Sequence, residues 1–116
     1  MDDDALLITL VRDLLALAGF DVHCFQSPRA ALDALVAAPE QFHAIVTDYN
    51  MSSISGIEVV ESARKVCPSV PTVVVSGYVD DMLHRRAAQA GVSAIVNKER
   101  MTEDLAVTLR RLSDAN

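Results

Sequence analysis

Three of the apolar runs in this sequence of 116 residues are followed directly by polar residues that could take part in catalysis or binding. These residues are Asp48, Ser76 and Lys98. An acidic pair, Asp2 and Asp3, stands at the start of the chain. Carboxylates, a hydroxyl and an ammonium group together can bind a divalent cation and a phosphoryl group.

Several carboxylates gathered in one cleft would need a compensating charge. Each close pair repels by roughly 4 kcal/mol at an effective dielectric constant of 20. Either protons bind and the pKa values rise, or a divalent cation lies among the carboxylates. Oxygen ligands of this kind suit Mg²⁺, which keeps open positions for phosphate oxygens. Lys98 and Ser76 could contact such oxygens, and Asp48 could be the nucleophile that forms an aspartyl-phosphate.

Helices and strands alternate along the predicted structure. Apolar periodicity predicts helices over residues 5–18, 29–37, 57–66, 80–90 and 102–112, and strands over 20–25, 44–47, 72–75 and 93–96. Asp4 is the predicted N-cap of the first helix, and Gly19 its C′ residue. Strands that are apolar on both faces and separated by helices indicate a doubly wound parallel sheet, so the fold class is α/β. Ligands of such sheets bind at the carboxyl ends of the strands.

Length and composition point to a single domain spanning residues 1–116. The net charge of −6 argues against nucleic-acid binding, which needs a basic face. No apolar run reaches the ~18–20 residues of a membrane span, and the acidic start is unlike a secretory signal. Two cysteines are too few for a disulfide framework or a zinc site. We therefore expect a cytoplasmic protein without membrane attachment.

The sequence resembles the receiver domain of two-component response regulators over residues 2–112. The resemblance is carried by the acidic pair Asp2-Asp3, the runs 46–51, 55–56 and 74–77, and Lys98. It implies a flavodoxin-like parallel sheet of five strands in the order 2-1-3-4-5. The run 75–78 together with Lys98-Glu99 is similar to receivers fused behind sensor kinases in hybrid histidine kinases.

The resemblance also implies roles for the polar residues. Asp48 would accept a phosphoryl group from a histidine kinase or a histidine phosphotransfer protein, without the chain being an enzyme in the usual sense. Ser76 would be the switch hydroxyl and Lys98 would contact a phosphoryl oxygen. The output would be a contact with a downstream protein partner. The implied Mg²⁺ ligands are the side chains of Asp3 and Asp48, the backbone carbonyl of Asn50, and Asp2 through water.

Four features depart from the family pattern. Family members place an apolar strand before the acidic pair, whereas only Met1 precedes it here. We expect that the first strand has been lost by truncation or a misplaced start, with a homodimer or strand-swapped dimer as the compensating alternative. Ser52 and Glu99 stand where the family usually has prolines, so the bond after Lys98 is predicted to be trans. Ile95 replaces a residue that is often aromatic.

The sequence is also compatible with two other functions. The departures suit a degenerate receiver that acts as an interaction module without being phosphorylated. A phosphatase with a carboxylate nucleophile would need a second carboxylate two residues after Asp48, and that position is Asn50. For Asp2 and Asp3 themselves, the alternative to metal binding is a solvated acidic terminus.

Overall fold

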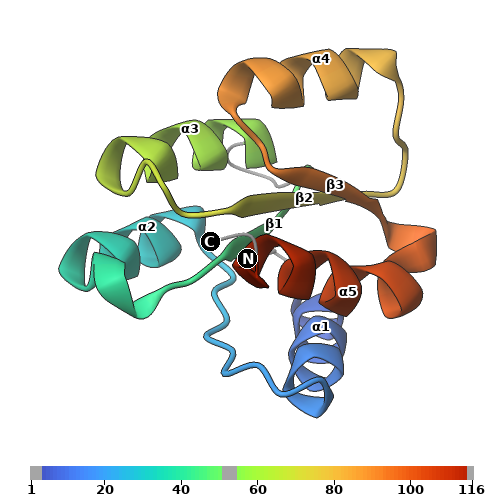
Figure 1. Ribbon diagram of the computed structural model, residues 1–116, viewed down its shortest axis with the longest axis horizontal. Coiled ribbons are helices and arrows are strands. Elements are labelled where there is room, and N and C mark those ends of the chain that lie inside the picture. Colours follow the sequence, from blue (N-terminus) through green and yellow to red (C-terminus); the bar gives the residue numbers. More distant parts are fainter. Residues whose placement is uncertain (1–3, 51–54, 115–116) are drawn as a thin grey trace.

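The computed structural model describes residues 4–50 and 55–114. At its centre is a parallel sheet of three strands in the order β1-β2-β3, comprising β1 (Ile45–Asp48), β2 (Thr72–Ser76) and β3 (Ala94–Asn97) (Figure 1). In the register of the sheet, Asp48 of β1 pairs with Val75 of β2, and Ser76 of β2 pairs with Asn97 of β3. The polar residues that end the strands therefore meet at one edge of the sheet.

Helices cover both faces of this sheet (Figure 1). One face is covered by α1 (Ala5–Leu17) and α5 (Met101–Asp114), and the other by α3 (Gly56–Val66) and α4 (Asp81–Ala90). Helix α2 (Pro28–Ala37) packs beside α3. Two short 3₁₀ helices complete the described elements, η1 (Pro39–Gln41) and η2 (Lys98–Arg100).

The alternation of side chains along β2 divides the core into two clusters. Val73 and Val75 face α1 and α5, where they pack in one cluster with Leu105. Val74 points the other way and packs in a second cluster with Val60 of α3. Because successive side chains of a strand point to opposite faces, a run that is apolar throughout is what a sheet covered on both sides requires. The predicted α/β class with a parallel sheet is confirmed.

Local sequence signals set the helix ends. Asp4 caps α1, and its Oδ1 accepts hydrogen bonds from the backbone N–H groups of Leu6 and Leu7 at 3.0 and 3.3 Å. Gly19 follows the end of α1 with φ 96°, and Gly91 caps α4 with φ 83°. Only glycine adopts such positive φ values readily. The predicted cap at Asp4 and the predicted end at Gly19 are both confirmed.

The predicted strand over residues 20–25 is wrong. These residues belong to no helix or strand and form the connection from α1 to α2 (Figure 1). In the implied order 2-1-3-4-5, this second strand would pair only with the first. Residues 4–50 and 55–114 include no such first strand, so residues 20–25 have no neighbour with which to form a ladder. The described sheet consequently has three strands instead of five.

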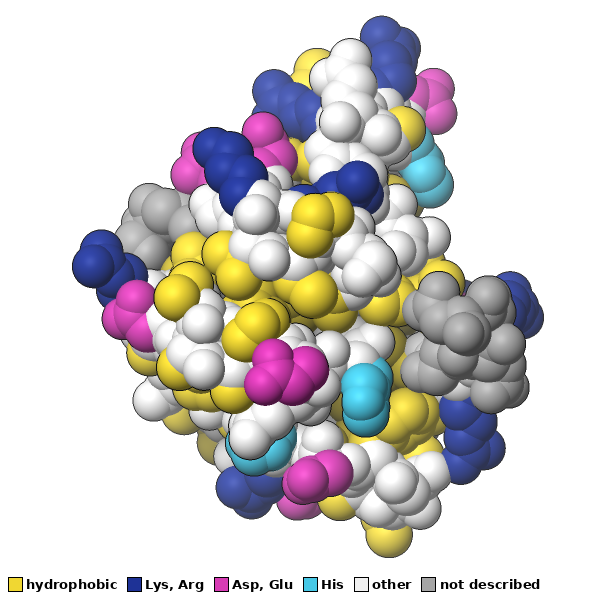
Figure 2. Space-filling model, turned by 60° about the vertical axis from the view of Figure 1, so that its left-hand side comes forward, with side chains coloured by type: hydrophobic (Ala, Val, Ile, Leu, Met, Phe, Trp, Pro, Cys, Tyr) yellow, Lys and Arg dark blue, Asp and Glu magenta, His cyan; other side chains and the backbone are white. Residues whose placement is uncertain are grey.

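Charged side chains lie mostly around the rim of the face shown in Figure 2, and hydrophobic side chains gather across its middle. Large apolar side chains that remain exposed include Leu6, Leu10 and Leu17 of α1 and Val36 of α2.

None of the helices in the described parts of the chain combines the length and apolar character needed to cross a bilayer.

Candidate functional site

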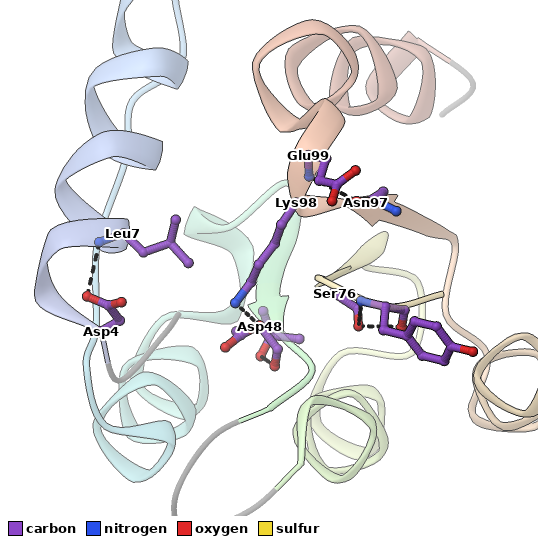
Figure 3. Close-up of polar contacts among 9 residues, drawn as sticks. Asp4, Leu7, Asp48, Ser76, Asn97, Lys98 and Glu99 are labelled. Carbon is purple, nitrogen blue, oxygen red and sulfur yellow. Dashed lines mark hydrogen bonds and ion pairs between the residues drawn. The ribbon is translucent and has the colours of Figure 1, made fainter. Parts of the chain in front are cut away.

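Asp48 is the buried carboxylate at the carboxyl edge of the sheet. It ends β1 with only 5% of its surface exposed. The Nζ atom of Lys98 lies 3.0 Å from its Oδ1 (Figure 3). Lys98 reaches Asp48 from the start of η2, directly after β3, so two strand ends separated by β2 supply the two charges. The predicted proximity of these residues is thus present in the structure.

The same Asp48 oxygen has one cation beside it and no hydrogen bond of good geometry from the described residues. Lys98 is within ion-pair distance, but no group in the described residues forms a directional hydrogen bond with Oδ1, which is fully enclosed. A buried carboxylate oxygen normally has hydrogen-bond donors around it. This Oδ1 is therefore a hard oxygen donor with the ammonium group of Lys98 beside it.

The turn that carries Lys98 is held by its neighbours. Asn97 Oδ1 accepts a hydrogen bond from the backbone N–H of Glu99 at 2.9 Å (Figure 3). The bond between Lys98 and Glu99 is trans, as predicted from the absence of proline. Asn97 thus caps η2 and fixes the backbone from which the Lys98 side chain extends towards Asp48.

Ser76 is at the predicted strand end, but its hydroxyl is engaged with its own loop. It is 1% exposed, and its Oγ donates to the carbonyl of Tyr78 at 2.8 Å while accepting from the Tyr78 N–H at 3.3 Å. In Figure 3 these contacts lie apart from the pair formed by Asp48 and Lys98. The structure brings Asp48 and Lys98 together and leaves Ser76 bonded to the loop between β2 and α4.

The backbone after Asp48 is fixed by close approach of α3. The N–H of Gly56 donates to the carbonyl of Tyr49 at 2.8 Å, and a Cβ atom at position 56 would lie 2.4 Å from the carbonyl oxygen of Asp48. Only glycine fits this approach. Gly56 belongs to the predicted motif, but its steric role could not be predicted, because it arises from a contact between two segments and not from a local sequence pattern.

Tyr49 is a further neighbour of the site. It is half-buried beside α3 and α4, and its hydroxyl accepts a hydrogen bond from Arg86 at 3.3 Å. Its backbone N–H donates to the carbonyl of Val75 at 2.8 Å, which continues the ladder between β1 and β2. These contacts favour packing. Tyr78, in contrast, is 76% exposed.

The expected Mg²⁺ ligands are only partly within the described structure. Asp2 and Asp3 lie outside the described residues. Asn50 is exposed two residues after Asp48. Within residues 4–50 and 55–114, no three His, Cys, Asp or Glu side chains converge as a metal site. The fit of Mg²⁺ depends on the available Asp48 Oδ1, whose chemistry as a hard oxygen donor is suitable.

Comparison with known sequences gives a consistent result. The sequence profile of the response regulator receiver domain family matches residues 1–110. The transcriptional regulatory protein FixJ of Bradyrhizobium diazoefficiens is 29% identical over 119 residues, covering 99% of this chain and 57% of FixJ. The sensory/regulatory protein RpfC of Xanthomonas campestris is 29% identical over 123 residues, covering 97% of this chain and 17% of RpfC. The chain thus spans little more than half of FixJ and a small part of RpfC.

Solved structures show the same fold. A response regulator receiver domain protein from Clostridium thermocellum superposes with a TM-score of 0.91 at 19% identity, covering 98% of this chain and 90% of that one. The receiver domain of the histidine kinase CKI1 from Arabidopsis thaliana, solved as a complex with Mg²⁺ and BeF₃⁻, has a TM-score of 0.84 at 25% identity. That match covers 97% of this chain and 86% of the other. The receiver fold expected from the sequence is confirmed.

Proposed function

The chain belongs to the response regulator receiver domain family, and from that premise we propose that Asp48 accepts a phosphoryl group. The donor is a phosphohistidine on a histidine kinase or on a histidine phosphotransfer protein. Receiver domains partner with histidine kinases and are signalling phosphoacceptors, not enzymes in the classical sense. The single observation that carries the proposal is the buried Asp48 carboxylate with Lys98 Nζ at 3.0 Å.

The transfer proposed at Asp48 balances without an additional reactant. A carboxylate oxygen of Asp48 forms a bond to phosphorus while the bond between phosphorus and the donor's imidazole nitrogen breaks. The imidazole leaves with the electron pair, and the product is an acyl phosphate on Asp48. Lys98, already next to the carboxylate, pairs with a phosphoryl oxygen and balances its charge.

We assign the Mg²⁺ site to Asp2, Asp3, Asp48 and the Asn50 carbonyl. When bound, Mg²⁺ neutralises negative charge on the phosphoryl oxygens during transfer. Asp48 supports this assignment because its enclosed Oδ1 is a hard oxygen donor that receives no hydrogen bond of good geometry from the described residues. The CKI1 receiver domain offers a precedent, since it was solved with Mg²⁺ and the phosphoryl mimic BeF₃⁻.

Ser76 has to change partners to act as the switch in this proposal. Its hydroxyl is bonded to Tyr78 on both sides, as donor and as acceptor. To donate to a phosphoryl oxygen on Asp48, it must release the Tyr78 carbonyl. The loop between β2 and α4 then loses the hydrogen bond at the Tyr78 carbonyl, one of the two that hold its first turn. We place the output, a contact with a downstream protein, on the surface of α4, β3 and α5, where Met82 and Val107 are exposed.

Phosphorylation can be tested by intact-mass spectrometry with a small phosphodonor such as acetyl phosphate. We expect one added phosphate that requires Mg²⁺ and is absent from the variant Asp48→Asn. The matched control is Asp80→Asn, which makes the same chemical change at the N-cap of α4, where asparagine caps equally well. An unmodified wild-type chain, or a modified Asp48→Asn variant, would contradict the proposal.

A second function is favoured by the engaged hydroxyl of Ser76 and the formed ion pair at Asp48. In this alternative the chain is a degenerate receiver that binds its partner without phosphorylation, since the Ser76 hydroxyl is already hydrogen-bonded within its loop and Asp48 is already paired with Lys98. It predicts no binding of Mg²⁺ at millimolar concentration, together with partner binding that survives Asp48→Ala. The phosphoacceptor proposal predicts the opposite result in both measurements.

A further inference from the structure

A polar cavity of about 280 Å³ lies between α3 and α4, two helices that pack side by side on one face of the sheet (Figure 1). Helix α3 lines it with Glu58 and Glu61, and α4 lines it with Arg86 and Gln89. The members of each pair are three positions apart, so each pair projects from one side of its helix. Sites for small molecules measure about 300–1,000 Å³, so this volume suits a ligand of amino-acid size.

The charged side chains around this cavity have opposite signs. Glu58 and Glu61 bring two carboxylates from α3, and Arg86 brings a guanidinium group from α4. Within residues 4–50 and 55–114 none of these three side chains takes part in an ion pair, although all of them line the same cavity. Unpaired charges of both signs around one hollow are complementary to a ligand that itself carries both signs.

Arg86 is oriented by a residue from a third part of the chain. Its Nη1 donates to the Tyr49 hydroxyl at 3.3 Å, and Tyr49, directly after β1, also lines the cavity. A guanidinium group has several N–H donors in a planar fork, so Arg86 can still donate to a carboxylate while it is bonded to Tyr49. Ile57 and Ala90 add apolar surface to the lining. The cavity therefore combines an oriented cation, two carboxylates and an apolar part.

We propose that this cavity binds a small zwitterion with the size and charges of a cationic amino acid such as arginine. The carboxylate of the ligand pairs with Arg86 and accepts a hydrogen bond from the amide of Gln89, and its cationic end lies at Glu58 and Glu61. Two carboxylates against one guanidinium group favour a ligand with an excess of positive charge. Acidic amino acids and phosphorylated compounds therefore do not fit.

This binding is separate from phosphoryl transfer. The described residues that line the cavity do not include Asp48, Ser76 or Lys98. Binding can therefore be measured without Mg²⁺ and without a phosphodonor. The result does not depend on whether Asp48 accepts a phosphoryl group.

An NMR titration of the 116-residue chain with L-arginine tests the proposal. We expect saturable shifts of the backbone amides at residues 58–61 and 86–90, with a dissociation constant of about 1 mM or lower. L-argininamide, in which a neutral amide replaces the carboxylate, should bind at least about tenfold more weakly. L-glutamate should cause no saturable shifts at these residues.

Three results of this titration would overturn the proposal. The first is shifts that do not saturate with L-arginine below about 10 mM. The second is equal binding of L-arginine and L-argininamide, since the cavity would then recognise only the cation. The third is equally tight binding of N-acetyl-L-argininamide, which would assign the cavity to an arginine side chain of a partner protein.

Variants at neighbouring positions of α4 give an independent test. Arg86→Gln should weaken binding of L-arginine about tenfold or more and abolish the preference for L-arginine over L-argininamide. The matched control is Arg85→Gln, at the adjacent exposed position, which does not line the cavity. Both side chains are exposed, so we expect both variants to fold. Equal effects of the two substitutions would refute the proposal.

Substitutions of the acidic residues examine the cationic end of the ligand. Glu61→Gln should weaken binding of L-arginine and of L-argininamide by the same factor, because both ligands keep the guanidinium group. Glu103→Gln makes the same change at an exposed position of α5 and should leave binding unchanged. Binding that is unaffected by Glu61→Gln would contradict the assigned orientation of the ligand.

Discussion

Lys98→Met removes the cation that faces the buried carboxylate of Asp48 and keeps a side chain of similar length. With Nζ and Oδ1 at 3.0 Å, the attraction is about 5 kcal/mol at an effective dielectric constant of about 20. Lys98 is 32% exposed, so water screens part of this attraction, and the variant no longer has to desolvate an ammonium group. We expect a net loss of about 2–3 kcal/mol in the free energy of unfolding, because Asp48 stays buried without its cation.

Urea denaturation followed by circular dichroism at pH 7 measures this loss. With the m-value typical of small domains, the midpoint should fall by about 1–2 M urea. The matched control is Arg100→Met, which breaks a solvent-exposed pair with Asp104 at 3.2 Å. Because both partners of that pair are exposed, its loss should change the free energy of unfolding by less than about 0.5 kcal/mol.

A double-mutant cycle shows whether the effect runs through Asp48. In the Asp48→Asn background no buried anion remains, so Lys98→Met should lower the free energy of unfolding by less than about 1 kcal/mol. The coupling energy between the two positions is then about 2 kcal/mol. The reasoning is refuted if Lys98→Met has the same effect with and without Asp48, or no larger effect than Arg100→Met.

Three further predictions concern the backbone, the hydroxyl and the metal at the same site. Gly56→Ala should destabilise the fold by about 2–3 kcal/mol in urea, because its Cβ would lie 2.4 Å from the carbonyl oxygen of Asp48. Gly77→Ala, whose Cβ would meet its nearest neighbour at 3.9 Å, serves as the control, and equal effects would contradict the steric argument. Ser76→Ala should lose about 1 kcal/mol by thermal unfolding, because the loop at Tyr78 loses two hydrogen bonds, and Ser76→Thr should recover it. Mg²⁺ at ten times its dissociation constant should stabilise the wild type by about 1.4 kcal/mol and leave Asp48→Asn unchanged; equal stabilisation of both would place the metal elsewhere.

Those parts of the fold that depend on local signals could be predicted from the sequence. Asp4 and Gly19 bound α1 because a capping carboxylate and a residue with positive φ act on atoms within a few positions in the chain. The strands that end at Asp48 and Ser76 were predictable because runs apolar on both faces suit a covered parallel sheet. Since parallel strands end at one edge, the meeting of Asp48 and Lys98 followed from the order of elements.

The orientation of Ser76 could not be predicted in the same way. Its position at the end of β2 follows from the strand, but the direction of its hydroxyl depends on the backbone of Tyr78, which supplies both a donor and an acceptor. The close approach of Gly56 to Asp48 likewise depends on where α3 starts relative to β1. Both features are contacts whose geometry is decided after the elements are placed.

Residues 20–25 show why strand prediction fails when a partner is absent. Their composition favours a strand, but a strand is stabilised by hydrogen bonds to a neighbour, and a neighbour is not a property of the segment itself. Helix α2, which follows directly, forms as predicted because its hydrogen bonds are internal and Ser27 caps its start.

Asp48 also lines a cavity of about 340 Å³ that residues 20–25 share with α1 and α5. Its position is nonetheless fixed by contacts from the other side: the ladder to Val75, the approach of Gly56, and the ion pair with Lys98. None of these contacts involves residues 20–25. A change in the conformation of residues 20–25 should therefore leave the geometry between Asp48 and Lys98 in place.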